Sequence, residues 1–286
     1  MQARLHTLLG DYPVTRTLKS GELRSPYVAF DFADVKVPNT AFKRVVRALE
    51  FDVAELAIVT FLLARAHGNS LRLLPAVVTA RFQHPLLVYN AARGHLSPAD
   101  LPGRRIGLRS YSVTTATWVR GILYDDYGIP PERIEWVAFE EPHVAEYCDP
   151  PNVQRAPAGA QMIAMLLEGD LDAVIIGERS SDPRLKTVIP DPDASAQAWY
   201  RRTGALQINH MLVVKDDVAT AHPHAAEEIV RMFSESKRAA GLPAPGTLDT
   251  QPIGREANRR NLEVAIDCVY RQGMIPRRFE PEELYA

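Results

Sequence analysis

The chain has 286 residues, of which 46% are hydrophobic, and a formal net charge of −2 at pH 7. A chain of this length buries a large core, and we expect two lobes. The absence of a basic excess argues against nucleic acid or an anionic membrane surface as a partner.

Cysteine use and the length of the apolar runs indicate a cytoplasmic protein. Cys148 and Cys268 are far apart and form no Cys-x-x-Cys pair, so we expect neither a disulfide framework nor a zinc ribbon. The N-terminal apolar run is too short for a signal peptide, and no run approaches the roughly 20 residues of a transmembrane helix. The oligomeric state stays open, a homo-oligomer included.

Strand and helix patterns alternate along the chain. Short apolar runs bounded by turn residues predict strands, and apolar residues three or four positions apart predict helices. We expect strands over residues 4–9, 27–32, 51–53, 73–79, 85–89, 105–108, 134–139, 185–189 and 211–214, with a turn and a strand in 169–176. We expect helices over residues 41–50, 54–66, 161–168, 196–202, 223–240 and 255–271, and one that ends near Tyr127.

Three polar residues near the N-terminus are candidates for a binding site. Asp11 and Tyr12 follow the first strand, and ligands of open α/β sheets bind at the carboxyl ends of strands. A plain turn explains these two residues equally well. Glu55 falls in the first turn of the helix expected over 54–66, where an acid interacts favourably with the helix dipole. That structural role is the simpler interpretation, and an acid or base facing a cleft is the alternative.

Three further residues can bind carboxylates or transfer protons. Arg81 can hold a carboxylate with two parallel hydrogen bonds. His84 titrates near neutral pH and can act as acid or base. Taken alone, these two are better explained as a surface arginine and a hydrogen-bonded histidine. His210 stands at the start of the strand expected over 211–214.

The stretch 107–123 offers a candidate anion site. It leaves a strand, crosses a loop rich in hydroxyl groups and enters a helix. Ser112, Thr114 and Thr115 are residue types that cap helices, and the first N–H groups of a helix lack intrahelical acceptors. These donors and the helix dipole favour a carboxylate or phosphate. An ordinary capped helix without a ligand explains the stretch slightly better when it is considered alone.

The sequence contains no standard metal-binding motif. His143, Glu146, Cys148 and Asp149 lie close together, but their spacing matches no such motif, so we interpret the segment as a solvated loop. We therefore assign no metal ligands, although Glu55 and the two candidate histidines could converge in the fold.

The order of the elements predicts two α/β lobes. Alternating strands and helices favour largely parallel sheets, and there are too many elements for one compact sheet. We place residues 1–85 and 209–286 in one lobe and residues 86–208 in an inserted second lobe. This is the plan of a bilobal, periplasmic-binding-protein-like fold with a ligand cleft between the lobes.

Four segments carry a family resemblance: Phe51-Asp52-Val53-Ala54-Glu55-Leu56, Arg81-Phe82-Gln83-His84, Trp118-Val119-Arg120-Gly121 and His210-Met211. Through them the chain resembles the 4,5-dihydroxyphthalate decarboxylase family, which belongs to the type II periplasmic-binding-protein-like superfamily, so the resemblance implies the type II bilobal fold. Two less specific segments, 100–107 and 168–173, recur across binding-protein-like folds. The resemblance extends from residue 5 to about residue 237. The family has Arg where Gln83 stands and Pro where Asn209 stands, and these departures bear on the substrate.

The resemblance implies a lyase that removes CO2 without oxidation from a hydroxylated aromatic (di)carboxylic acid. The substrate it implies is 4,5-dihydroxyphthalate, converted to protocatechuate in phthalate degradation, with no organic cofactor. Such a reaction needs a general acid, a hydrogen-bond acceptor at the phenol and a clamp for the carboxylates.

The resemblance and the residue types together suggest roles for the candidates. We expect His84 and His210 to transfer protons and Arg81 to pair with a carboxylate. Glu55 is expected to hold a phenolic hydroxyl or to tune a histidine. The expected substrate-binding residues are Ser112, Thr114, Thr115, Asp11, Tyr12 and Trp118.

Two other functions stay open. One is a cytoplasmic solute-binding or sensing protein for a small carboxylate, and the other is a dehydratase of the menaquinone-precursor type. A shared fold cannot separate them from a decarboxylase. CO2 release would mark the decarboxylase, tight binding of an unchanged ligand the binding protein, and elimination without CO2 the dehydratase.

Overall fold

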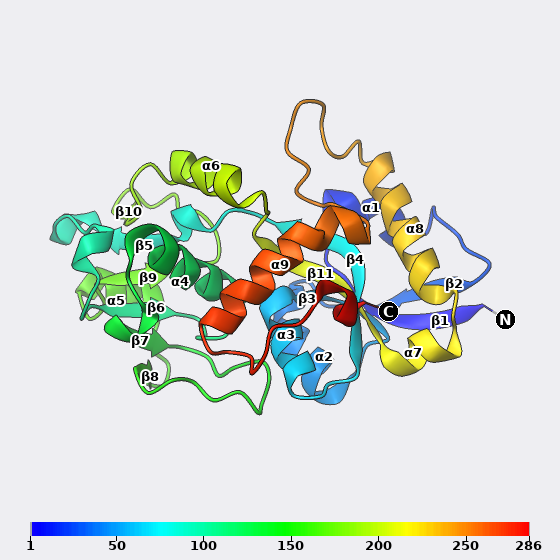
Figure 1. Cartoon of the computed structure of the whole chain (residues 1–286), viewed down its shortest axis with the longest axis horizontal. Coiled ribbons are helices and arrows are strands. Elements are labelled where there is room, and N and C mark those ends of the chain that lie inside the picture. Colours follow the sequence, from blue (N-terminus) through cyan, green and yellow to red (C-terminus); the bar gives the residue numbers. More distant parts are fainter. Residues whose placement is uncertain (1, 286) are drawn as a thin grey trace. The chain divides into compact units, whose positions relative to one another are not determined.

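The computed structural model describes residues 2–285, and the chain divides into two compact α/β units (Figure 1). Unit 1 comprises residues 1–81, 208–267 and 275–286, and unit 2 comprises residues 82–207 and 268–274. The sequence placed the changes of lobe at 85/86 and 208/209, whereas the contacts change at 81/82 and 207/208. The segment 268–274, which the sequence assigned to the first lobe, groups with unit 2.

Unit 1 is built on a five-stranded sheet with the order β2-β1-β3-β11-β4. The strands are β1 (Ala3–Leu8), β2 (Val28–Phe32), β3 (Val53–Ala57), β4 (Leu71–Ala80) and β11 (Ile208–Lys215). β1 runs parallel to β2 and β3, whereas β11 runs antiparallel to β3 and β4. The sheet is therefore mixed, and the inner strand β11 departs from the largely parallel arrangement that the sequence predicted.

The sheet of unit 1 is accompanied by α-helices. They are α1 (Arg16–Lys19), α2 (Phe42–Ala48), α3 (Ile58–Ala66), α7 (Asp216–Ala221), α8 (Ala225–Ala239) and most of α9 (Arg255–Arg271). Ile229, Met232 and Phe233 of α8 pack in one core with Leu5 and Val214 of the sheet. The spacing of these α8 residues puts them on one face, as an amphipathic helix requires.

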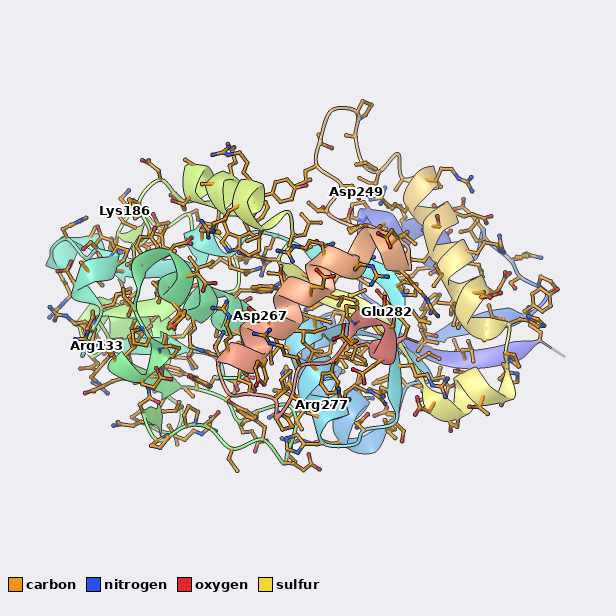
Figure 2. All side chains as sticks on the ribbon, in the orientation of Figure 1. Arg133, Lys186, Asp249, Asp267, Arg277 and Glu282 are labelled. Atoms are coloured by element: carbon orange, nitrogen blue, oxygen red, sulfur yellow. The ribbon has the colours of Figure 1, made fainter. Side chains whose placement is uncertain are left out.

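The segment 241–252, which contains several Pro and Gly residues, is anchored to α8. The Lys237 ammonium lies 2.7 and 2.6 Å from the two carboxylate oxygens of Asp249 and donates to the Gln251 carbonyl at 2.6 Å. Figure 2 labels Asp249 on this segment. Lys237 is buried, and a buried cation needs such partners. The contact therefore joins the helix end to the segment that leads into α9.

Unit 2 is built on a six-stranded sheet with the order β10-β5-β9-β6-β7-β8. Its strands are β5 (Leu87–Asn90), β6 (Arg105–Leu108), β7 (Glu135–Ala138), β8 (Val153–Arg155), β9 (Ala173–Ile175) and β10 (Leu185–Thr187). Its helices are α4 (Thr114–Tyr127), α5 (Met162–Glu168) and α6 (Pro192–Thr203). β6, β7, β8 and β9 are parallel, and β5 runs antiparallel to β9 and β10. Within residues 2–285, no helix is long and apolar enough to span a bilayer.

Strand β3 is longer than the sequence predicted, and this changes the position of Glu55. The prediction put residues 54–66 in a helix, but β3 continues to Ala57 and α3 begins only at Ile58. Ala, Glu and Leu favour helices when isolated. Here pairing with β1 on one side and with β11 on the other outweighs that preference. Glu55 therefore lies on a central strand, and its expected place in a first helical turn is wrong.

Substitution of Gly107, a residue of β6, tests how tightly the sheet of unit 2 is packed. A Cβ atom at this position would lie 2.7 Å from Leu171 Cδ1 and 3.0 Å from Val174 Cγ1. We expect Gly107→Ala to lower the free energy of unfolding by about 1–3 kcal/mol, because overpacking forces its neighbours to shift. Gly177→Ala is the matched control, since its methyl group would meet no atom within 4 Å. Urea unfolding compares the two variants, and equal midpoints would show that the interior relaxes without cost.

Candidate functional site

A buried carboxylate forms the centre of a hydrogen-bonded cluster in unit 1. Glu55 is 0% exposed. Its Oε1 accepts a hydrogen bond from the Tyr12 hydroxyl at 2.9 Å and lies 3.1 Å from His210 Nδ1, while its Oε2 accepts the Gly10 backbone N–H at 2.9 Å. We call these four residues, Gly10, Tyr12, Glu55 and His210, the Glu55 cluster. Hydrogen bonds from several donors offset the cost of burying a carboxylate in the protein interior.

Strand register explains why Glu55 and His210 meet. Leu212 of β11 lies directly opposite Glu55 of β3, and His210 lies opposite Ala57. Side chains two residues apart on a strand share a face, so His210 is on the same face as Glu55 and is its diagonal neighbour. The sequence had placed His210 at the start of a strand, but it is the third residue of β11.

The hydrogen bond to Glu55 leaves one nitrogen of His210 free for chemistry. A carboxylate only accepts hydrogen bonds, so Nδ1 of His210 carries the proton in this contact. Nε2 is then the ring nitrogen that can give or take a proton. The His210 ring also makes an edge contact with Phe42 at a centroid distance of 5.1 Å, which restricts its rotation. About one fifth of the His210 side chain is exposed to solvent.

The turn after β1 places Tyr12 over Gly10. A Cβ atom at Gly10 would lie 2.7 Å from Tyr12 Cζ, so only glycine allows the ring to take this position. Thr15 fixes the turn, because its Oγ1 accepts the Tyr12 N–H at 2.9 Å and donates to the Gly10 carbonyl at 2.7 Å. Sequence reasoning missed Thr15. The signal was a threonine that follows Pro13 closely, since threonine hydroxyls often close turns of this kind.

Tyr12 stays a neutral donor to Glu55. Burial and then the charge of Glu55 raise the pKa of Tyr12 far above its usual range. The charge of Arg81, an exposed residue directly after β4, lowers the pKa of Tyr12 and so opposes this shift. Asp11, also predicted for the site, is 83% exposed and pairs with Lys19. It makes no hydrogen bond to the Glu55 cluster.

His84 of unit 2 has a different environment. It is fully buried, and neither ring nitrogen has a hydrogen-bond partner. Its ring lies 6.4 Å from that of Phe82 and 6.3 Å from that of Trp199, which in turn lies 6.0 Å from the ring of Trp118. Burial and then the charge of Arg202 lower the pKa of His84 to about 4. At neutral pH His84 is therefore an uncharged hydrogen-bonding group.

The start of α4 differs from the expected capped helix. Val113 occupies the N-cap position, and no side chain caps the helix there. Ser112 precedes this position, and Thr114 and Thr115 are the first two helical residues. The predicted role of these hydroxyl residues in binding a carboxylate stays a prediction.

A buried arginine that sequence reasoning missed holds the loop before α4. The Arg120 side chain is fully buried, and its guanidinium lies 3.7 Å from the centre of the Tyr111 ring. It donates to the Tyr111 carbonyl at 2.8 Å and to Gln272 Oε1 at 2.8 Å. Among the described residues it forms no salt bridge. The available signal was its place in the Trp-x-Arg-Gly segment, between buried helical residues.

The described part of the chain brings no three His, Cys, Asp or Glu side chains together in a way that could hold a metal ion. Of the three side chains whose convergence the sequence left open, Glu55 and His210 meet in unit 1, and His84 is a residue of unit 2.

The chain is similar in sequence to two 4,5-dihydroxyphthalate decarboxylases. It is 32% identical over 251 residues to the protein of that name from Comamonas testosteroni, covering 83% of this chain and 76% of the relative. It is 31% identical over 211 residues to the one from Pseudomonas putida, covering 69% of this chain and 81% of the relative. No protein-family model matches the chain.

Solved structures share the fold at lower identity. The alkanesulfonate-binding protein SsuA from Xanthomonas axonopodis pv. citri, bound to MOPS, matches with a TM-score of 0.60 and 16% identity, over 100% of this chain and 99% of that one. The periplasmic aliphatic sulphonate binding protein of Escherichia coli matches with a TM-score of 0.59 and 14% identity, over 100% and 98%. The predicted periplasmic-binding-protein-like fold is confirmed by these matches.

The low pKa of His84 predicts a pH dependence of stability. Below about pH 6.5 the unfolded chain protonates this histidine, whereas the folded chain does so only near pH 4. The unfolded state then binds more protons than the folded state. The free energy of unfolding therefore decreases as the pH is lowered, by at most about 1.4 kcal/mol per pH unit from this group. We expect His84→Gln to lose this contribution between pH 6.5 and 4, and the exposed-site variant His67→Gln to keep it. Urea unfolding across this range tests the expectation, which fails if His84→Gln keeps the wild-type slope.

Proposed function

The chain belongs to the 4,5-dihydroxyphthalate decarboxylase family, and we propose that it removes CO2 from a hydroxylated aromatic acid by protonating the ring at the Glu55 cluster. Both named relatives are decarboxylases, which supports a carboxy-lyase. The observation that carries the proposal is the contact of Glu55 with both Tyr12 and His210. The substrate we propose is 4,5-dihydroxyphthalate and the product protocatechuate, in the catabolism of phthalates.

The reaction needs one proton and no oxidant. The bond between the ring carbon and the carboxylate breaks, CO2 leaves, and a C–H bond forms at the same ring carbon. Release of CO2 first would leave an aryl anion, so protonation of the ring carbon comes first. A hydroxyl para to the carboxylate stabilises the protonated ring by donating electrons to it. In 4,5-dihydroxyphthalate each carboxylate is para to one hydroxyl.

We assign the proton donation to His210. Its Nδ1 is held by Glu55, so Nε2 faces away from that carboxylate and can deliver the proton. Glu55 stabilises the imidazolium form and fixes the ring, as a carboxylate partner does for a catalytic histidine. The two oxygens of Glu55 are already occupied by three donors, which favours this role over the binding of a phenolic hydroxyl.

The remaining groups of unit 1 support substrate binding. We propose that Arg81, an exposed cation whose charge acts on Tyr12, pairs with a substrate carboxylate.

We also propose that the reaction takes place in the cytoplasm. Both cysteines are free thiols, which suits a reducing compartment.

Loss of the proton donor should slow CO2 release from 4,5-dihydroxyphthalate. We expect His210→Asn to lower kcat by about 10²–10⁴-fold, the usual contribution of a positioned acid. The matched control is His224→Asn, which changes an exposed histidine outside the Glu55 cluster and should leave kcat unchanged. Turnover of His210→Asn at the wild-type rate would remove His210 from the mechanism.

The need for a para hydroxyl predicts both substrate range and product. Phthalate, which has no hydroxyl, should release no CO2. 4-Hydroxyphthalate should lose only the carboxylate para to its hydroxyl and yield 3-hydroxybenzoate. Product identification after incubation with each acid tests this. Formation of 4-hydroxybenzoate would contradict the proposed protonation step, and binding of these acids without release of CO2 would favour a solute-binding protein.

A further inference from the structure

Two buried side chains of unit 2 carry polar atoms without hydrogen-bond partners. His84 and Gln207 are each 0% exposed. Both ring nitrogens of His84 and the Nε2 of Gln207 lack a partner. Such groups are rare in native proteins, because a buried donor or acceptor without a partner loses the hydrogen bonds that it makes to water in the unfolded chain. Three such atoms on two residues therefore call for an explanation.

The two residues lie beside the same turn. Oε1 of Gln207 accepts the backbone N–H of Gln83 at 2.6 Å, and Gln83 directly precedes His84. This hydrogen bond fixes the orientation of the Gln207 amide, because the opposite assignment would bring two donors together. Nε2 of Gln207 is thus a buried donor without a partner. The same side chain is hydrogen-bonded to the residue that precedes His84.

The surroundings of His84 are aromatic. Phe82 and Trp199 make edge contacts with its ring at centroid distances of 6.4 and 6.3 Å. Trp118 of α4 continues the group through its contact with Trp199 at 6.0 Å. Aromatic side chains with a few polar groups among them are the usual lining of sites for aromatic ligands.

We propose that His84 and Gln207 form a hydroxyl-binding pair that receives a phenolic hydroxyl of an aromatic ligand. A neutral imidazole offers one donor and one acceptor, and the Gln207 Nε2 offers donors only. A hydroxyl group can donate to the imidazole nitrogen and accept from the amide. At the acceptor nitrogen of the imidazole a carboxylate cannot replace a hydroxyl, because it has no proton to donate. The pair therefore favours a hydroxyl at this nitrogen.

This inference concerns ligand binding by unit 2 and does not depend on the chemistry proposed for the Glu55 cluster. A site that hydrogen-bonds a hydroxyl rejects an analogue without it, because the buried polar groups are then left unpaired. Loss of one such interaction corresponds to about 10- to 100-fold in affinity. The pair should thus set a preference among aromatic acids that share a carboxylate.

Calorimetric titration of the full chain with 3,4-dihydroxybenzoate and with benzoate tests the pair. We expect the wild type to bind the dihydroxy acid about 10- to 100-fold more tightly than benzoate. His84→Phe and Gln207→Leu should each lose most of this preference while keeping their affinity for benzoate. His95→Phe, which changes an exposed histidine of unit 2, should keep the preference.

Three results would overturn the inference. The wild type could bind the two acids equally tightly, or both variants could keep the wild-type preference for 3,4-dihydroxybenzoate. The variants could also lose affinity equally for both acids, which would indicate a general structural disturbance. Substitutions at two residues keep the test valid if one variant fails to fold. A crystal structure with 3,4-dihydroxybenzoate that shows only a water molecule on both side chains would also overturn it. If the variants lose the preference but the wild type releases no CO2, this pair stands and the proposed decarboxylation fails.

Discussion

The hydrogen bonds to one buried carboxylate organise the functional part of unit 1. Glu55 lies on a central strand, where an ionised group is stable only with donors around it. Each donor places a demand on the sequence. Gly10 must lack a side chain so that Tyr12 can fold over it, and β11 must pair with β3 in the register that puts His210 beside Glu55. The carboxylate thus links a turn and two strands that are distant in the chain.

Unit 2 contains buried polar groups that are hydrogen-bonded and others that are not. Arg120 is fully buried, and the carbonyl of Tyr111 and the amide oxygen of Gln272 accept hydrogen bonds from it. His84 and Gln207 are equally buried but keep unpaired atoms. Satisfied buried groups hold a structure in place, whereas unsatisfied ones store a cost that a ligand can relieve. This contrast assigns Arg120 to the architecture of the unit and the other pair to binding.

Some of these features follow from the sequence alone, and others depend on the fold. The helix 255–271 and the strand 105–108 have the predicted bounds, because their periodicity and flanking turns act locally. Residue type and family resemblance also singled out Glu55 and His210 as candidates for the site. Their contact could not be derived, since it depends on the register between strands more than 150 residues apart. Thr15 and Gln207 were missed because their roles arise only from burial and from partners elsewhere in the chain.

A double-variant cycle tests most directly whether Glu55 acts through His210. The rate of CO2 release is measured for Glu55→Gln, for His210→Asn and for the variant with both changes. If the two residues act as one unit, the double variant is no slower than His210→Asn alone, because Glu55 has nothing left to orient. If the two losses multiply, Glu55 and His210 act independently, and the account of the cluster is wrong.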